Sequence, residues 1–185
     1  SHLSTVRRAR KINRILGETY PYAVAELDFD TPFELLIATV LSAQTTDVRV
    51  NSVTGALFAH YPDATALASA RYEEVEPYIQ SLGFYRAKAR SIVNLSRQLV
   101  EEHGGQVPST LEELVKLAGV GRKTANVVLG NAFGVPGLTV DTHFGRLARR
   151  MGFTTAEAPE AVEKDVAELI ERKDWTIFSH RMVYH

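Results

Sequence analysis

Residues 35–41 read Leu-Leu-Ile-Ala-Thr-Val-Leu, and almost every side chain in this run is apolar. Thr31, Pro32 and Glu34 precede the run in the order of a helix start: an N-cap residue, a proline at the first helical position and a glutamate three residues after the cap. A helix that is apolar nearly all round is stable only when other elements cover it. We therefore expect this helix to lie buried inside a domain.

The rest of the chain also reads as helices joined by short loops. Ser109 and Glu112 repeat the capping-box pattern, so a helix is expected to begin there and to end at Gly119. Residues 137–140 are too short to found a sheet, and other strand signals are nearly absent. About ten helices, and hence an all-α fold, are predicted. Besides the buried helix they are expected at about residues 4–20, 46–60, 64–70, 72–82, 86–103, 109–119, 121–133, 142–151, 159–172 and 175–184.

Charge and composition leave the partner of the chain open. The formal net charge is −1, but the basic residues are clustered. Because only the charge that faces phosphates counts, such clusters are compatible with a DNA-binding surface as well as with solvated helix faces. No apolar run approaches the roughly 20 residues that a membrane helix needs, so no membrane association is expected. The clusters are Arg7, Arg8, Arg10, Lys11 and Arg14; Arg86, Lys88 and Arg90; and Arg146, Arg149 and Arg150.

The sequence contains no cysteine. Disulfides, cysteine nucleophiles and thiolate metal sites are therefore excluded within these 185 residues. This composition fits a reducing, cytoplasmic setting.

Gly119, Val120 and Gly121 lie between two expected helices. The glycines permit a positive φ, which a short turn between helices usually needs, and they allow another molecule's backbone to come close. Main-chain N–H groups at such a turn can bind phosphate oxygens, although the glycines alone favour an ordinary αα-hairpin. Lys123 follows in the first turn of the next helix. A helix N-terminus is an unfavourable place for a cation, and an amine there is a candidate nucleophile, but most lysines at helix starts simply point into water.

Asp141 precedes Thr142 and His143 at an expected helix start, where an N-cap role is sufficient to explain it. The chain is also long enough for Asp141 to reach Lys123, which would give it a second role. The helix after Lys123 travels about 15 Å. The following loop, residues 134–140, spans up to about 23 Å. The chain can thus return toward Lys123, and an amine paired with a carboxylate would make a nucleophile with its base.

Together these segments resemble a known family. Residues 117–152, LAGVGRKTANVVLGNAFGVPGLTVDTHFGRLARRMG, resemble the helix-hairpin-helix and Asp-bearing loop of the endonuclease III family of DNA glycosylases. LLIATVLSAQTTDVRVN at 35–51 and GFYRAKA at 83–89 extend the resemblance, which covers nearly the whole chain. It implies the helix-hairpin-helix DNA glycosylase fold, with two helical domains and the DNA cleft between them. Residues 25–135 would form a six-helix domain that contains the hairpin, and residues 1–24 and 136–185 a discontinuous second domain.

The resemblance also implies roles for individual residues. Lys123 matches the family's catalytic lysine and Asp141 its catalytic aspartate. Gln44 matches the glutamine that fills the gap left by an extruded nucleotide, and Phe84 stands where the family presents an apolar wedge. Ala118 replaces a proline that is usual in the family, a departure expected to leave the turn intact. Further DNA contacts are expected from Gly119, Val120, Gly121, Arg122, Thr142 and His143, although packing between helices explains His143 equally well.

The implied activity is that of a bifunctional DNA glycosylase and abasic-site lyase. Its substrate would be duplex DNA that carries an oxidised pyrimidine, such as thymine glycol, or an abasic site. Two alternatives stay open: a monofunctional glycosylase with another base preference, and a non-catalytic helix-hairpin-helix module that only binds DNA. A monomer in the bacterial cytoplasm, associated with the nucleoid, is expected.

The family usually carries a four-iron–four-sulfur cluster, held by four cysteines that begin a few residues after the position of His185. This chain has no cysteine and cannot bind that cluster as written. Either the protein has been truncated or the cluster loop lies outside this sequence, and the cluster is then expected in the full-length protein. A member that naturally lacks the cluster is the less favoured alternative.

Overall fold

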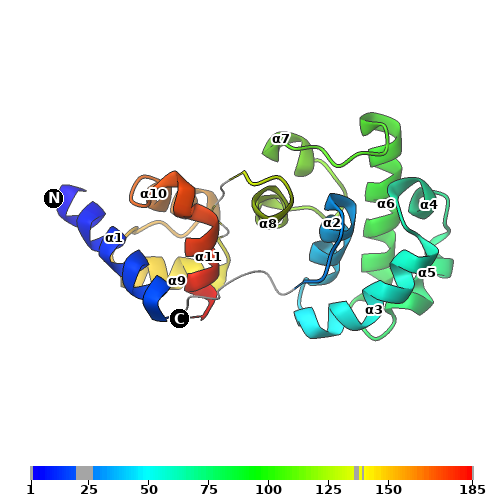
Figure 1. The fold of residues 1–185 in the computed structure, drawn as a ribbon, viewed down its shortest axis with the longest axis horizontal. Helices are drawn as coiled ribbons and strands as arrows, with labels where there is room; N and C mark the ends of the chain where they lie inside the picture. The colour runs from blue at the N-terminus through cyan, green and yellow to red at the C-terminus, as the bar shows by residue number, and fades with distance from the viewer. Residues whose placement is uncertain (1, 20–26, 136–137, 139, 185) are drawn as a thin grey trace. The chain divides into compact units, whose positions relative to one another are not determined.

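The computed structural model describes residues 2–19, 27–135, 138 and 140–184, and within them it contains helices and no strand. This confirms the predicted all-α class (Figure 1). The chain forms two compact units. Unit 1 combines two segments far apart in sequence, Ser1–Ala25 and Gly134–His185, and unit 2 is the continuous segment Glu26–Phe133. The helices are α1 His2–Thr19, α2 Pro32–Leu41, α3 Asp47–His60, α4 Ala64–Ala68, α5 Tyr72–Ile79, α6 Tyr85–His103, α7 Leu111–Leu114, α8 Arg122–Ala132, α9 Thr142–Arg150, α10 Pro159–Ala167, the 3-10 turn η1 Arg172–Asp174, and α11 Trp175–Tyr184.

Unit 2 is built around α2. The Thr31 hydroxyl accepts from the Glu34 N–H at 3.1 Å, and the Glu34 carboxylate accepts from the Thr31 N–H at 3.2 Å, so the predicted capping box is present. Residues 35–41 are all buried, and α2 packs against α3, α6 and α8. The expectation of a buried helix at this place is confirmed, and its burial fixes the positions of both neighbouring loops.

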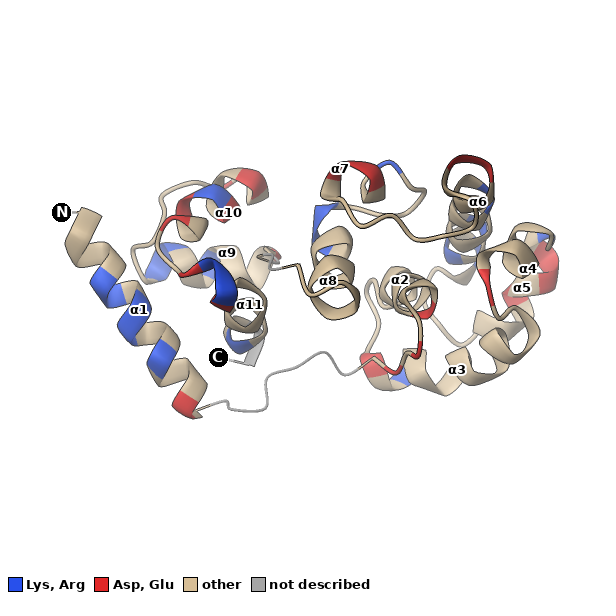
Figure 2. Cartoon of the chain, turned by 45° about the horizontal axis from the view of Figure 1, so that its top comes forward, with Lys and Arg blue, Asp and Glu red and all other residues tan. Residues whose placement is uncertain are grey.

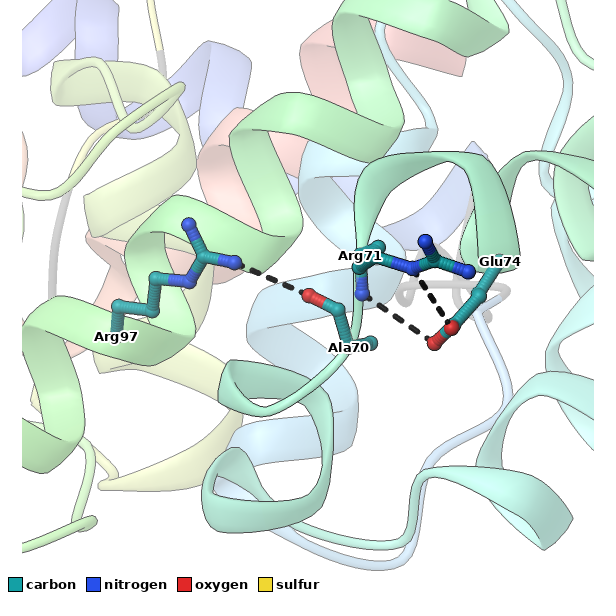
Figure 3. A network of polar contacts seen from close by, with 4 residues as sticks. All are labelled: Ala70, Arg71, Glu74 and Arg97. Atoms are coloured by element: carbon teal, nitrogen blue, oxygen red, sulfur yellow. Dashed lines mark hydrogen bonds and ion pairs between the residues drawn. The ribbon is translucent and has the colours of Figure 1, made fainter.

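Helix α6 is the long element against which α4 and α5 pack. The Arg97 guanidinium of α6 donates to the carbonyls of Ala68 and Ala70, both at 3.1 Å, and so closes the α4–α5 loop onto α6. Figure 3 shows the bond to Ala70. Beside it, Arg71 and Glu74 form an ion pair at 3.0 Å, and this hydrogen bond lowers the pKa of the exposed Glu74 carboxyl. The contacts hold α6 in a fixed position within unit 2.

Unit 1 has its own apolar core, to which α1, α9, α10 and α11 contribute. The rings of Phe144 and Phe178 meet edge to face at its centre, with centroids 5.9 Å apart. Asn13 of α1 accepts from the Arg181 guanidinium of α11 at 2.8 Å, which ties the first helix to the last. The buried members of this core are Ala9, Leu16, Leu138, Phe144, Ala148, Phe153, Val162, Val166, Leu169, Ile170, Phe178 and Met182.

Helix α10 ends at Ala167 and not at the expected residue 172, and α5 ends at Ile79 and not at 82. Helix α7 differs most from its prediction. The cap of α7 is Thr110, whose hydroxyl accepts from the Glu113 N–H at 3.3 Å; the expected pair Ser109 and Glu112 is wrong by one position. The helix is also a single turn, Leu111–Leu114, and does not continue to Gly119. The expected loop 134–140 includes residues 136, 137 and 139, which lie outside the described part of the chain. In that described part, no helix is both long enough and apolar enough to cross a membrane.

Candidate functional site

The turn between α7 and α8 depends on Gly119. Its φ is +73°, and a Cβ at this position would lie 2.9 Å from the Cβ of Ser91 on α6 and 3.4 Å from Cγ1 of Val40 on α2. Both the backbone conformation and the space therefore require glycine. Because of this close approach, the turn lies directly against α2 and α6.

Gly121 has a different reason to be glycine. Its φ is −94°, so the expectation that it needs a positive φ is wrong. A Cβ built at Gly121 would meet no heavy atom within 4 Å, because this side of the turn is open. Val120 between the glycines is buried, with 6% of its surface exposed. Its side chain anchors the turn, and what the turn presents to another molecule at this point is main chain.

Gln98 of α6 braces the same turn, and the sequence pattern did not single it out. Its side-chain oxygen accepts from the Ala118 N–H at 2.7 Å, and its side-chain nitrogen donates to the Lys116 carbonyl at 3.1 Å. A proline at position 118 would have no N–H to donate. The departure from the family's usual proline is thus matched by a hydrogen bond that only a non-proline residue can make.

Arg122 and Lys123 are the first two residues of α8, and both are exposed. Gly121 is the N-cap of this helix and has no side chain with which to cap it. The helix terminus carries a partial positive charge, and together with the two cations it makes the start of α8 an electropositive surface. The geometry suits an anionic partner, and it presents an amine at the edge of the hairpin.

Gln44 and Phe84 share an unusual backbone. Gln44, in the loop between α2 and α3, has φ 56°, and Phe84, immediately before α6, has φ 60°. They are the only two non-glycine residues with positive φ in the part of the chain that the structure describes. Both side chains are exposed, Phe84 by 69%. Unit 2 therefore projects an amide and an aromatic ring from two strained loops.

Asp141 lies in unit 1, where it is the N-cap of α9. Its carboxylate accepts from the Phe144 N–H at 2.8 Å and is half-buried, so the expected capping role is confirmed. Thr142 and His143 form the first turn of α9; Thr142 is exposed and His143 half-buried.

The three basic clusters have different environments. The five cations of α1 are all exposed and follow one another along the helix (Figure 2). The three arginines of α9 are exposed as well. In α6 the cluster divides: Arg86 and Arg90 are exposed, whereas Lys88 is buried, with 6% exposure. Burial lowers the pKa of Lys88. A basic stretch in the sequence gives no signal for this difference.

The predicted site residues are divided between the two units: those of the hairpin and the two strained loops belong to unit 2, and those at the start of α9 belong to unit 1. Gly119, Val120 and the start of α8 sit on α2 and α6, and Gln44 and Phe84 stand at the ends of these same two helices. The second set occupies the start of α9, as described above. The predicted residues thus all occupy loops or first turns of helices.

The residues present do not fit an iron–sulfur cluster. None of the 185 residues is a cysteine, so none can supply a thiolate. Among the described residues, no group of three or more His, Asp or Glu side chains is arranged to hold a metal ion.

Comparison with known proteins identifies what the chain is similar to. Residues 37–172 match the HhH-GPD superfamily of base excision DNA repair proteins. The chain is 52% identical over 183 residues to endonuclease III of Synechocystis sp., and this match covers 98% of the chain and 84% of that protein. It is 41% identical over 170 residues to endonuclease III of Escherichia coli, covering 92% of the chain and 81% of that protein.

Solved structures give the same result. A non-covalent complex of an endonuclease III with DNA and a trapped covalent endonuclease III–DNA intermediate each match at 44% identity and a TM-score of 0.91. Each match covers 97% of this chain and 84% of the other. At this level of identity the similarity extends beyond the fold to the sequence.

Proposed function

Because this chain belongs to the HhH-GPD superfamily of base excision DNA repair proteins, and within it to the endonuclease III family, we propose that it excises oxidised pyrimidines from duplex DNA and then nicks the strand. The proposed activity is that of a bifunctional DNA glycosylase and abasic-site lyase. A damaged base of the thymine glycol type, or an abasic site, is the proposed substrate.

One observation carries this proposal: an exposed lysine, Lys123, in the first turn of the helix that follows the glycine hairpin. A DNA-binding module needs cations on its surface, but it has no need for an amine at one particular place. Attack by an amine also yields a covalent intermediate. A chain 44% identical to this one has been trapped in a covalent complex with DNA, which supports a nucleophilic route over simple hydrolysis.

In the proposed reaction the Lys123 amine attacks C1′ of the damaged nucleotide. A C1′–N bond to the lysine forms, the glycosidic bond breaks, and the base leaves with the bonding electron pair and takes up a proton. Loss of the amine proton and opening of the sugar ring give a Schiff base between Lys123 and C1′. Removal of a proton from C2′ then expels the 3′ phosphate by β-elimination, and water hydrolyses the Schiff base to regenerate the lysine.

Asp141 would assist as the proton acceptor or by stabilising positive charge at the sugar. The reaction also requires the nucleotide to leave the base stack, at a cost of a few kcal/mol. Gln44 and Phe84 are the proposed residues that occupy the vacated space, the role of wedge side chains in duplex DNA. The main chain at Gly119 and Gly121, with Arg122, would hold the DNA backbone, and Thr142 and His143 are proposed as further contacts.

Borohydride trapping tests the proposal. The wild type should form a covalent, reduction-stable complex with duplex DNA that contains an abasic site. Lys123→Ala should form none, whereas Lys116→Ala, which removes an exposed lysine elsewhere in the hairpin region, should trap like the wild type. If Lys123→Ala forms as much covalent complex as the wild type, Lys123 is not the nucleophile. A panel of duplexes with different lesions then separates an oxidised-pyrimidine preference from other base preferences.

A further inference from the structure

The start of α6 is an uncapped helix terminus. Phe84 is its N-cap and makes no side-chain capping bond, and the first turn contains no acidic residue. The first hydrogen bond of the helix runs from the Lys88 N–H to the Phe84 carbonyl at 3.0 Å. The main-chain N–H groups of Tyr85, Arg86 and Ala87 precede this bond and receive no cap from Phe84. Such a terminus attracts anions.

Lys88 is the second observation at this place. It is 94% buried (6% exposed), and its Nζ has no hydrogen-bond partner among the described residues. Side chains on a helix lean toward its N-terminus, so the Lys88 stem is expected to run back along the first turn of α6. A buried cation without a partner is costly, and a helix N-terminus makes it more so. Packing does not explain the ammonium, because a methionine would fill the same space.

The neighbouring cations of α6 are engaged elsewhere. The Arg86 guanidinium lies 5.4 Å from the centroid of the Tyr85 ring, and the Arg90 guanidinium 5.3 Å from that of Tyr72. Lys88 is therefore the cation of this cluster that lacks a described partner. An acceptor supplied by a bound molecule would give this ammonium a partner.

The hairpin turn lies close by on the same helix. A Cβ at Gly119 would be 2.9 Å from the Cβ of Ser91. Ser91 is six residues after Tyr85, which corresponds to about 9 Å along the helix axis. Successive phosphates of one strand advance by about 3.4 Å along the duplex, so a strand held at the hairpin has further phosphates within reach of the start of α6.

We propose that the N-terminus of α6 is a second phosphate site of unit 2, in which the Lys88 ammonium and the N–H groups of Tyr85, Arg86 and Ala87 bind one phosphate of the DNA backbone beside Phe84. Rotation about the bonds of its four-carbon stem brings the ammonium to the phosphate. The site rests on the proposed function, since the occupant is the DNA substrate. It gives the buried ammonium its acceptor and fixes the strand next to the proposed wedge.

Binding to a duplex with an uncleavable tetrahydrofuran abasic analogue tests the site, with the salt concentration varied. For Lys88→Met, the slope of log affinity against log salt concentration should fall by about 0.9, the value of one phosphate contact. Lys164→Met, which removes an exposed lysine on α10, should keep the wild-type slope. An unchanged slope for Lys88→Met would overturn the proposal.

A second measurement identifies the phosphate. Single neutral methylphosphonates are placed in turn along both strands of the same duplex. One position should weaken binding by the wild type but have no effect on Lys88→Met, whereas identical sensitivity profiles for the two proteins would overturn the proposal. Lys88→Met should unfold at the same or a higher temperature than the wild type. If it does not fold, Lys88→Gln is measured instead, with the same expectations.

The two proposals fail in different ways. The tetrahydrofuran analogue has no aldehyde, so its binding does not depend on Lys123 chemistry. Absence of borohydride trapping by the wild type would refute the lyase activity and leave the salt slopes interpretable. Normal trapping with equal slopes would refute the phosphate site alone.

Discussion

Removal of the Gln98 side chain is expected to loosen the hairpin while leaving the rest of unit 2 intact. Gln98→Ala deletes two hydrogen bonds, one from the Ala118 N–H at 2.7 Å and one to the Lys116 carbonyl at 3.1 Å. Both bonds join α6 to the turn that precedes α8. The helix itself should tolerate the change, since alanine is the best helix former.

The magnitude follows from the number and kind of bonds. A neutral hydrogen bond contributes about 1 kcal/mol to stability, so the two together correspond to about 2 kcal/mol. The free energy of local opening at the turn should fall by this amount. Amide exchange reports it at Val120, whose N–H donates to the Leu117 carbonyl at 3.1 Å within the turn. A loss of about 2 kcal/mol corresponds to exchange about 30-fold faster.

A double-mutant cycle with Ala118→Pro decides whether the bond to position 118 is the cause. Proline removes the N–H donor, so in the wild-type background it should lower the opening free energy. In the Gln98→Ala background the acceptor is already gone, and proline should be neutral or stabilising by up to about 1 kcal/mol through its restricted unfolded state. The expected coupling energy is about 1 kcal/mol. Additive effects of the two substitutions, or equally fast exchange in the exposed-surface control Gln106→Ala, would refute the reasoning.

Two further predictions concern the glycines and the buried lysine. Gly119→Ala should lower the free energy of unfolding in urea by about 2 kcal/mol, because φ is +73° and the new Cβ lies 2.9 Å from Ser91. Gly121→Ala should leave it within about 0.5 kcal/mol but weaken binding to abasic-analogue DNA, since its Cβ meets no protein atom. Burial lowers the pKa of Lys88 below its ordinary 10.5. Below the lowered pKa of the folded protein, the charged ammonium therefore reduces the free energy of unfolding by its full amount. This loss of stability disappears as the pH rises from the lowered pKa toward 10.5. Lys88→Met should therefore exceed the wild type in unfolding free energy at pH 7, by a margin that shrinks toward pH 10.5; a constant margin would contradict this reasoning.

Local chemistry made part of this fold predictable. The capping box at Thr31 and Glu34 uses atoms three residues apart, so the sequence pattern contains all of it. The apolar run after it predicted burial for the same reason, because no distant residue is needed to know that such a helix must be covered. The cap at Thr46 and the helix stop at Gly104 are equally local.

Other features depend on residues distant in sequence and could not be predicted. Whether Lys88 is buried depends on what packs over the start of α6, and Arg86 and Arg90, two residues away on either side, are exposed. The brace at Gln98 requires the turn 20 residues later to lie against α6. Gly121 was expected to share the backbone of Gly119, but α8 begins with an extended N-cap residue there, and its glycine is explained by open space instead.

The two strained loops supply an argument for function that the resemblance does not contain. A left-handed conformation costs a non-glycine residue about 1–2 kcal/mol, and glycine would adopt it without that cost. Gln44 and Phe84 nevertheless occupy it at φ 56° and 60°. The exposed Phe84 ring gains little from packing within the free protein, since 69% of it is in contact with solvent. This backbone cost and the exposure of Phe84 support the proposed role of both residues in filling the gap left by an extruded nucleotide, where an amide and an aromatic ring find partners.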